Sequence, residues 1–214
     1  ALVTLDQLMI TYPEQAFLYN LQGACFYAQE QYDIAITSYQ KAIALNPEFA
    51  EALNGLGLTQ SSLGENNTAI FSLKKALAFK PDFAEANNNL GVAYYNLGDS
   101  TEAIKNFTNA ILLKLNYADA FFNLGNVFKQ YKVSAKATQE FVNTINTNPH
   151  LFKKHINTSK LNSQFEIQLI LYERAIAINS KFSNAWWNLS LVQLLLGNYK
   201  EGWVNYEWRW KKDD

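Results

Sequence analysis

Apolar residues recur three and four positions apart along most of the chain, which is the spacing of one face of an α-helix. In AEANNNLGVAYYNLGDSTEAIKNFTNAILLK, one apolar stripe runs from Leu90 to Leu97 and Gly98 interrupts it. A second stripe then runs from Ala103 to Ile111. This pattern predicts two helices joined by a short turn.

The helix pair is repeated with a period of 34 residues, so the chain is an array of similar units. Four kinds of position recur in phase: a glycine in the first helix, a small residue and a bulky residue in the second, and a proline after it. The four series are Gly23, Gly57, Gly91 and Gly125; Ala35, Ala69, Ala103 and Ala137; Tyr39, Leu73, Phe107 and Phe141; and Pro13, Pro47, Pro81 and Pro149, with Leu115 in the proline series.

Each series has a physical reason. Two helices approach closely only where their side chains are small, and bulky residues such as Tyr94 and Phe107 fill the gaps beside those contacts. A proline ends the second helix and redirects the chain into the next unit.

These features resemble the tetratricopeptide repeat (TPR) family along essentially the whole chain. The resemblance implies an all-α fold, a right-handed α-solenoid of antiparallel helix hairpins. The expected division of this single solenoid is a half repeat at 1–13, repeats at about 16–47, 50–81, 84–115 and 118–149, a degenerate repeat at about 150–180, and a last repeat at about 183–214.

The degenerate repeat lacks the signature glycine, and its apolar pattern returns only at LYERAIAINSKF. A short first helix and a loop near Asn157–Gln164 are therefore expected there. The start, ALVTLDQLMITYP, matches only the second half of a unit, which favours either a fragment or an unusual cap.

Composition excludes several classes of function. The net charge of −1 argues against nucleic acid as a partner, and no apolar run approaches the ~18 residues that a membrane-spanning helix needs. Cys25 is the single cysteine, and neither His150 nor His155 has partners at metal-ligand or catalytic spacing. The sequence thus predicts a cytoplasmic protein that is not an enzyme and has no metal, no cofactor and no membrane insertion.

The remaining candidate is a surface. In TPR proteins the first helix of each pair lines the concave face, and the positions on either side of the Leu-Gly pair are expected to be exposed. These candidate peptide-binding residues are Asn20, Tyr27, Asn54, Asn88, Asn89, Tyr95, Asn96, Phe122, Asn123, Asn126, Lys129, Trp187 and Asn188, with Ser61 at an equivalent place. Asparagine offers a donor and an acceptor to a peptide backbone, and aromatic rings add contact area.

Asn89, Asn123 and Asn188 share one place in their repeats. This is similar to the asparagine ladder of O-linked N-acetylglucosamine transferases, although Leu21 and Gly55 hold that place in earlier repeats. The carboxylate clamp that binds chaperone C-termini is not expected, because it needs Lys and Arg on this face.

The last repeat ends in GNYKEGWVNYEWRW. Most of its aromatic residues have the spacing of packing residues. Arg209 is unusual because it stands where the family has a small residue. We therefore predict an interface at Trp203, Trp208, Arg209 and Trp210, against a following domain or a second copy. The phrase also resembles the last repeat of bacterial TPR proteins that carry a glycosyltransferase-like domain.

The leading hypothesis is a scaffold that binds a peptide or a partner protein on its concave face. One alternative is a substrate-recruiting arm of a larger bacterial glycosyltransferase. A second is a self-assembling scaffold that forms homo-oligomers through the solenoid ends.

Overall fold

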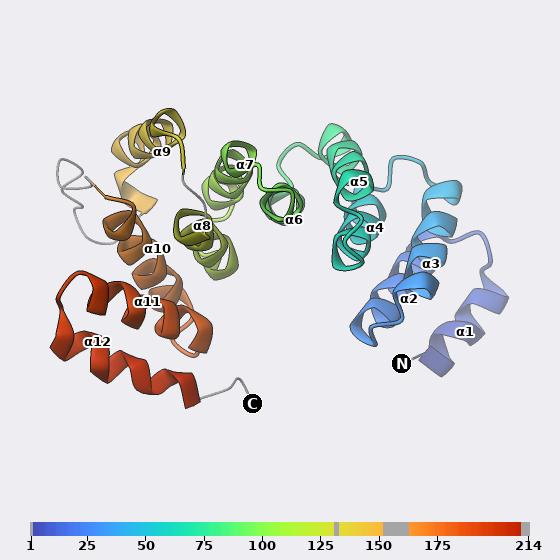
Figure 1. Ribbon diagram of the computed structural model, residues 1–214. Helices are drawn as coiled ribbons and strands as arrows, with labels where there is room; N and C mark the ends of the chain where they lie inside the picture. Colours follow the sequence, from blue (N-terminus) through green and yellow to red (C-terminus); the bar gives the residue numbers. More distant parts are fainter. Residues whose placement is uncertain (1, 131–132, 152–162, 211–214) are drawn as a thin grey trace. The chain divides into compact units, whose positions relative to one another are not determined.

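The computed structural model describes residues 2–130, 133–151 and 163–210, and that part of the chain is built from helices and their connections (Figure 1). The helices are α1 (Leu2–Thr11), α2 (Ala16–Ala28), α3 (Tyr32–Leu45), α4 (Ala50–Ser62), α5 (Asn66–Phe79), α6 (Ala84–Asn96), α7 (Ser100–Leu113), α8 (Ala118–Gln130), α9 (Ala135–Thr147), η1 (Pro149–Leu151), α10 (Gln164–Ile178), α11 (Ser183–Leu195), α12 (Tyr199–Tyr206) and η3 (Glu207–Trp210). The predicted all-α fold is confirmed.

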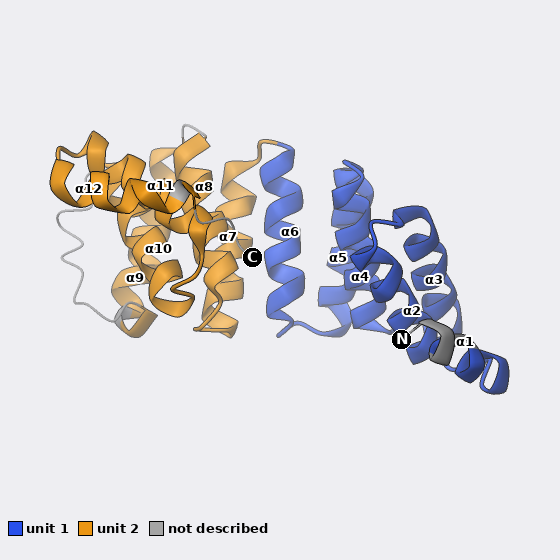
Figure 2. Ribbon diagram, turned by 90° about the horizontal axis from the view of Figure 1, so that it is seen from below, with its two compact units in different colours: residues 1–97 blue, residues 98–214 orange. Residues whose placement is uncertain are grey.

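The chain divides into two compact units, residues 1–97 with α1 to α6 and residues 98–214 with α7 to η3 (Figure 2). In the first unit, α2 packs along α3 and α4 packs along α5. Each second helix then packs against the first helix of the next pair, α3 on α4 and α5 on α6. This is the packing of successive helix hairpins that the 34-residue period predicts.

Glycine makes the close contact within each hairpin possible. A Cβ atom on Gly23 would lie 2.7 Å from the ring of Tyr39, and one on Gly57 would lie 2.6 Å from Cγ of Leu73. Tyr39 also fills the space beside Gly55. Its burial is reflected in its pKa, which desolvation and then the nearby Tyr27 and Cys25 raise to about 12.

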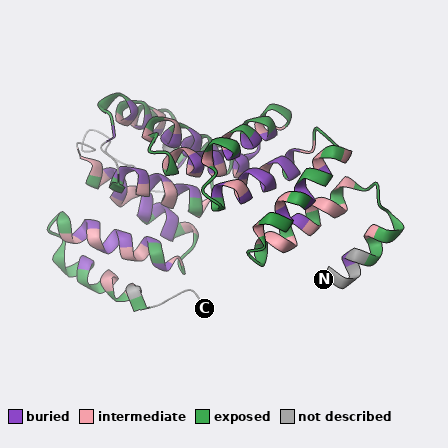
Figure 3. Cartoon of the chain, turned by 45° about the vertical axis from the view of Figure 1, so that its right-hand side comes forward, coloured by how far each residue is buried: buried purple, intermediate pink, exposed green. Residues whose placement is uncertain are grey.

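Successive hairpins share a core made of small and large residues. Ala50, Leu53, Ala76, Phe83 and Ala86 form one such cluster between adjacent hairpins, and Ile43 and Leu77 pack against it. Buried residues therefore follow the sides along which the helices meet, while the connections are mostly exposed (Figure 3). Each hairpin depends on its neighbour for part of its core.

The second unit differs from the pairing that the period predicts. The sequence places 135–147 beside 118–130, but α10 is the helix that packs along α8, and α9 packs against α7 and η1 (Figure 1). A Cβ on Gly125 would lie 2.6 Å from the ring of Tyr172 in α10. The amide nitrogen of Gln168 donates to the carbonyl oxygen of Phe128 at 3.0 Å.

The physical reason lies in what α10 buries. Ile167, Leu171 and Tyr172 are fully buried, and α10 is two residues longer than α9. Its start is also fixed by a capping box between Ser163 and Glu166. The short first helix and loop expected near Asn157–Gln164 fall mainly on residues 152–162, outside the described residues, and Gln164 itself begins α10.

The turns within the hairpins require a left-handed backbone. Gly64 and Gly197 adopt φ of 80° there, whereas Glu30, at the equivalent place between α2 and α3, adopts φ of 59°. A residue with a Cβ is strained in this region, by about 1–2 kcal/mol.

We predict that Glu30→Gly raises the free energy of unfolding by up to about 1 kcal/mol, because glycine removes most of this strain but also gains entropy in the unfolded chain. Urea denaturation followed by circular dichroism measures the change. The matched variant Gly64→Ala should have the opposite effect, since nothing lies within 4 Å of its Cβ and only the backbone is strained. Equal stability of Glu30→Gly and the parent would contradict the prediction.

Candidate binding surface

The candidate residues lie on the first helix of each hairpin: α2, α4 and α6 in the first unit and α8 and α11 in the second. Most are half-buried, and Asn96 and Lys129 are exposed. Asn88 and Asn188 are each only 6% exposed and Ser61 is also buried, so the expectation that they are exposed is wrong. The half-buried members are Asn20, Tyr27, Asn54, Asn89, Tyr95, Phe122, Asn123, Asn126 and Trp187.

In the first unit, polar side chains of successive first helices bond to one another. Nδ2 of Asn89 in α6 donates to Oδ1 of Asn54 in α4 at 3.0 Å. Nδ2 of Asn96 in α6 donates to Oδ1 of Asn66, the first residue of the second helix α5, at 3.2 Å. Oγ of Ser61 in α4 donates to the same oxygen at 3.1 Å. Ser61 is buried because its hydroxyl takes part in this small network.

Earlier in the same unit, the hydroxyls of Tyr27 in α2 and Ser62 in α4 lie 3.2 Å apart, within hydrogen-bond distance. Each pair of neighbouring first helices in this unit is therefore joined by at least one polar contact on this surface. Because an amide carries two donor hydrogens and one acceptor oxygen, Asn89 uses one of its two hydrogens on Asn54.

In the second unit, Asn126 is the centre of a second network. Its Oδ1 accepts from the Tyr172 hydroxyl and from Nδ2 of Asn188, both at 3.0 Å. Oδ1 of Asn188 in turn accepts from Nζ of Lys129 at 2.7 Å. These bonds satisfy both ends of the buried Asn188 amide, so its burial leaves no polar group of the amide unpaired.

Lys129 is the basic residue of this network. Desolvation by partial burial lowers the pKa of its ammonium group below the ordinary value. Its charged hydrogen bond to Asn188 is stronger than a neutral one. Lys129 therefore links α8 to α11 on the same side of the hairpins as Asn126.

The aromatic candidates pack against other rings. The ring of Phe122 lies 4.7 Å from that of Phe182, and Trp187 stacks on Tyr206 with centroids 4.9 Å apart. Their role in holding α8, α10, α11 and α12 together is structural. Each is half-buried, so part of each ring still contributes to the surface.

The asparagine ladder differs from the one the resemblance suggests. Asn89 and Asn188, which share one place in the repeat, bond to Asn54 and Asn126, which hold other places. Sequence reasoning also missed Tyr172 and Asn66, the residues that orient Asn126 and Asn96. The signal for Tyr172 was the pattern LYERAI, where tyrosine stands in the place of Tyr39.

The predicted interface at the end of the chain separates into two groups. Trp208 stacks on Trp186 with centroids 5.1 Å apart and planes within 7°, so it packs against α11. Trp203 and Trp210 are 59% and 71% exposed. The side chain of Arg209 lies outside the described part of the structure. The resemblance to repeats linked to a glycosyltransferase-like domain stays a prediction.

Among the described residues, no group of three or more His, Cys, Asp or Glu side chains is placed to hold a metal ion. Within the same residues, no helix combines the length and the apolar character needed to cross a membrane.

We predict that Asn126→Ala lowers the free energy of unfolding by about 1–3 kcal/mol, because it leaves the buried Asn188 amide without its acceptor. The matched variant Asn89→Ala removes a single bond to the half-buried Asn54 and should cost less than about 1.5 kcal/mol. Thermal and urea denaturation compare them. A smaller loss in Asn126→Ala than in Asn89→Ala would contradict the structural role assigned to Asn126.

A family profile for the TPR repeat matches residues 23–64, 61–98 and 93–131. Comparison with curated proteins by sequence gives no significant match. Among solved structures, a crystal structure of MamA is 26% identical, with 87% of this chain and 91% of that chain aligned and a TM-score of 0.61.

Two further structures are similar in fold. PilF of Pseudomonas aeruginosa is 18% identical over 90% of this chain and 74% of that chain, with a TM-score of 0.69. YrrB, described as a TPR protein with an unusual peptide-binding site, is 15% identical over 95% and 89%, with a TM-score of 0.58. At these identities the likeness concerns the fold alone.

Proposed function

The chain belongs to the TPR-repeat family, and we propose that it is a protein-interaction scaffold that binds an extended peptide on the first-helix surface of its hairpins. The amide networks of that surface carry the proposal. In the first unit, the half-buried Asn89 and Asn54 place their amides side by side on successive first helices. In the second unit, the half-buried Asn126 is the corresponding amide, and the buried Asn188 of α11 holds it in place.

The chemistry of these amides suits a peptide backbone. A backbone offers one donor and one acceptor per residue, and an asparagine side chain can pair with both. The amides already bond to one another, so an incoming peptide exchanges existing hydrogen bonds for new ones. Each exchange contributes little, about 0.5–1.5 kcal/mol for a neutral bond, and useful affinity needs several such contacts in a row. The similar fold of YrrB, which has a peptide-binding site, supports the proposal.

The charges nearby favour an internal peptide segment over a C-terminal carboxylate. Glu51, Glu85 and Asp119 lie in the first turns of α4, α6 and α8. A hydrogen bond from Lys80 holds the pKa of Glu51 below its ordinary value, so its carboxylate stays charged at neutral pH. Because Glu51 is paired with Lys80 at 2.8 Å, the like charge that a terminal carboxylate would meet comes from Glu85 and Asp119.

The test is selection of peptides from a displayed random library on the intact chain, followed by calorimetry with the selected peptides. Asn89→Ala and Asn123→Ala should each weaken binding by about twofold to tenfold, which corresponds to one neutral hydrogen bond. The matched control is Asn67→Ala, an exposed asparagine of the second helix α5. It should bind as the parent does.

Two results would contradict the proposal. One is unchanged affinity in the Asn89→Ala/Asn123→Ala double variant while the fold is retained. The other is binding that is lost when the selected peptide carries a C-terminal amide, since this would show recognition of a terminal carboxylate. Circular dichroism of each variant shows whether the fold is retained.

A second candidate function is self-association through α12 and η3, and the exposed apolar side chains there favour it. Ile43 and Leu77, at one shared place in the second helix, pack against the core between adjacent hairpins. Trp210 holds the equivalent place in the last repeat, and Val204 is 68% exposed beside Trp203. Apolar surface of this kind is typical of an interface, and a second copy of the chain presents the same surface.

We predict that the chain forms dimers at high micromolar concentration and that Trp203→Glu weakens them at least tenfold, because a carboxylate would be desolvated in the interface. Sedimentation velocity over a concentration series measures this. Lys200→Glu also places a carboxylate on α12 and changes the net charge by two units instead of one, but it replaces an exposed polar residue, so it is the control and should have little effect. A monomer at every concentration would contradict the second candidate.

A further inference from the structure

Two helices, α9 and α10, carry a residue pattern suited to packing along α8. In the first unit the second helices present a small residue, a bulky residue and another small residue to their partners. The sets at these three places are Ala35, Tyr39 and Ala42 in α3; Ala69, Leu73 and Ala76 in α5; Ala137, Phe141 and Thr144 in α9; and Gln168, Tyr172 and Ala175 in α10.

The spacing along the chain assigns the place beside α8 to α9. Gly23 and Tyr39, Gly57 and Leu73, and Gly125 and Phe141 are all 16 residues apart. In the structure, however, the ring next to Gly125 is that of Tyr172. The 34-residue period therefore predicts α9 beside Gly125, whereas α10 is the helix that lies there.

Neither helix fits this place fully. In α10, Gln168 stands where α3 and α5 have alanine, and its amide is buried and bonded to the carbonyl of Phe128. In α9, Thr144 stands where α3, α5 and α10 have alanine. Each helix thus has one oversized residue, and each has an aromatic ring at the central place.

In the structure, α9 is packed less completely against its neighbours than α10 is. Ala137, Phe141 and Ile145 are buried, and the ring of Phe141 already touches that of Phe128 in α8, with centroids 5.5 Å apart. A groove of about 170 Å³ nevertheless remains between α7 and α9. Ile104, Leu112, Phe141 and Thr144 are among the residues that line it. Exposed residues such as Thr101 and Asn109 also line this groove, so it is open to solvent and α9 covers α7 less completely than a fully packed helix would.

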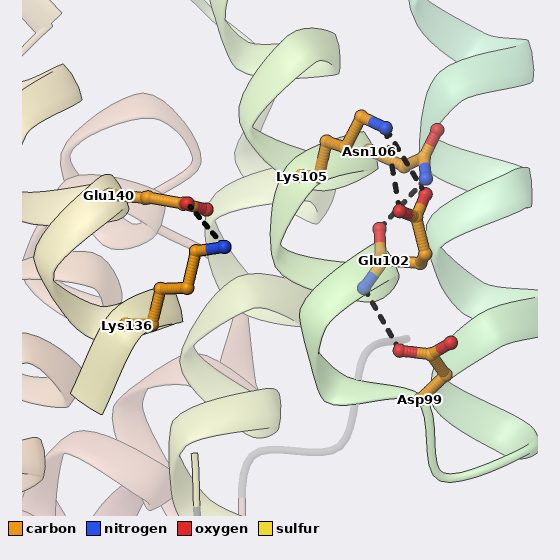
Figure 4. Close-up of polar contacts among 6 residues, drawn as sticks. All are labelled: Asp99, Glu102, Lys105, Asn106, Lys136 and Glu140. Carbon is orange, nitrogen blue, oxygen red and sulfur yellow. Dashed lines mark hydrogen bonds and ion pairs between the residues drawn. The ribbon is translucent and has the colours of Figure 1, made fainter. Parts of the chain in front are cut away.

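The ion pairs between described residues of α7 and α9 lie within one helix or the other and do not connect the two. Lys105 pairs with Glu102 within α7 at 3.4 Å, and Lys136 pairs with Glu140 within α9 at 4.0 Å (Figure 4). Each ion pair lies within one helix, so both would persist if α9 left α7. The helix could move without breaking either pair.

We infer that α9 and α10 are alternative partners of α8, and that α9 can replace α10 beside Gly125. The connection suits this exchange. Residues 131–134 separate α8 from α9, and residues 63–65 make the corresponding connection between α4 and α5. A connection of this length is typical of antiparallel neighbouring helices.

The exchange would act on the candidate binding surface. Tyr172 donates to Asn126, so departure of α10 removes one bond from the Asn126 network and frees an acceptor on α8. A peptide that binds Asn126 would then favour the α9-paired state, because a ligand shifts an equilibrium by its differential affinity for two states. This coupling rests on the proposed function, whereas the exchange itself does not.

Distances between spin labels test the exchange without any ligand. On a Cys25→Ser background, one label replaces the exposed Asp119 of α8 and the other replaces either Asn146 of α9 or Ala177 of α10, which are also exposed. Asn146 and Ala177 hold equivalent places two residues after Thr144 and Ala175. On exchange, Asn146 should therefore adopt the distance that Ala177 shows in the structure.

We expect Thr144→Ala to raise the fraction of chains with Asn146 at that distance by about fivefold or more, because alanine removes the overpacking at this place. Thr147→Ala is the matched control. Thr144 and Thr147 both donate to the carbonyl four residues earlier, at 3.0 and 3.1 Å, so each change removes one such bond from α9. Thr147 also accepts from Nδ2 of Asn148 at 3.0 Å, so the control disturbs the end of α9 at least as much as the test variant does. The control should leave the fraction unchanged.

A second variant keeps the inference falsifiable if the parent shows a single distance. Adding Tyr172→Ala to Thr144→Ala removes the ring that fills the space beside Gly125, and most chains should then place Asn146 near α8. The inference is overturned if, in this variant, the label at position 177 moves away from α8 while the label at position 146 does not move closer to it. It is equally overturned if Thr144→Ala and Thr147→Ala give the same distances. Retained helicity in circular dichroism is required for either comparison.

Discussion

The close contact between a glycine of one helix and a bulky side chain of the next is the interaction on which the hairpins depend. At Gly23, Gly57 and Gly125 there is no room for even one more carbon atom, because Tyr39, Leu73 and Tyr172 fill the space. The small residue brings the backbones together, and the large one supplies the buried area. Repeating this contact also sets the direction in which each first helix presents its remaining side chains, so the binding surface follows from the same geometry.

The periodic pattern was sufficient to predict the helices and their pairing in the first unit, since Gly23 and Gly57 each have one suitable partner within reach along the chain. It was not sufficient for α8. Phe141 and Tyr172 both satisfy the requirement at Gly125, and spacing favours the former while buried area favours the latter. The period describes only which residues recur along the chain. Which of α9 and α10 packs along α8 depends on all the side chains that each helix buries, including Ile167 and Leu171 of α10, and the period does not specify these.

The sequence predicted where the candidate residues stand in each repeat, but not how buried they are or which residues they contact. The positions of Asn89, Asn126 and Asn188 follow from the repeat, and their residue types are read directly from the sequence. Their burial depends on what the neighbouring hairpin presents. Lys129 and Asn126 of α8 satisfy the buried amide of Asn188. Tyr172 reaches Asn126 only because α10 occupies the place beside Gly125. Contacts between residues so far apart in sequence lie outside a repeat-by-repeat analysis.

These amide networks connect the stability of the array to its capacity to bind. Hydrogen bonds such as Asn89 to Asn54 hold successive first helices in order, and they also occupy the groups that a peptide would use. A ligand that pairs with these amides replaces bonds between hairpins with bonds to itself, so part of its binding free energy is spent on the exchange. Affinity should therefore depend less on any single asparagine than on how many amides a peptide can engage at once, which is a property of extended segments.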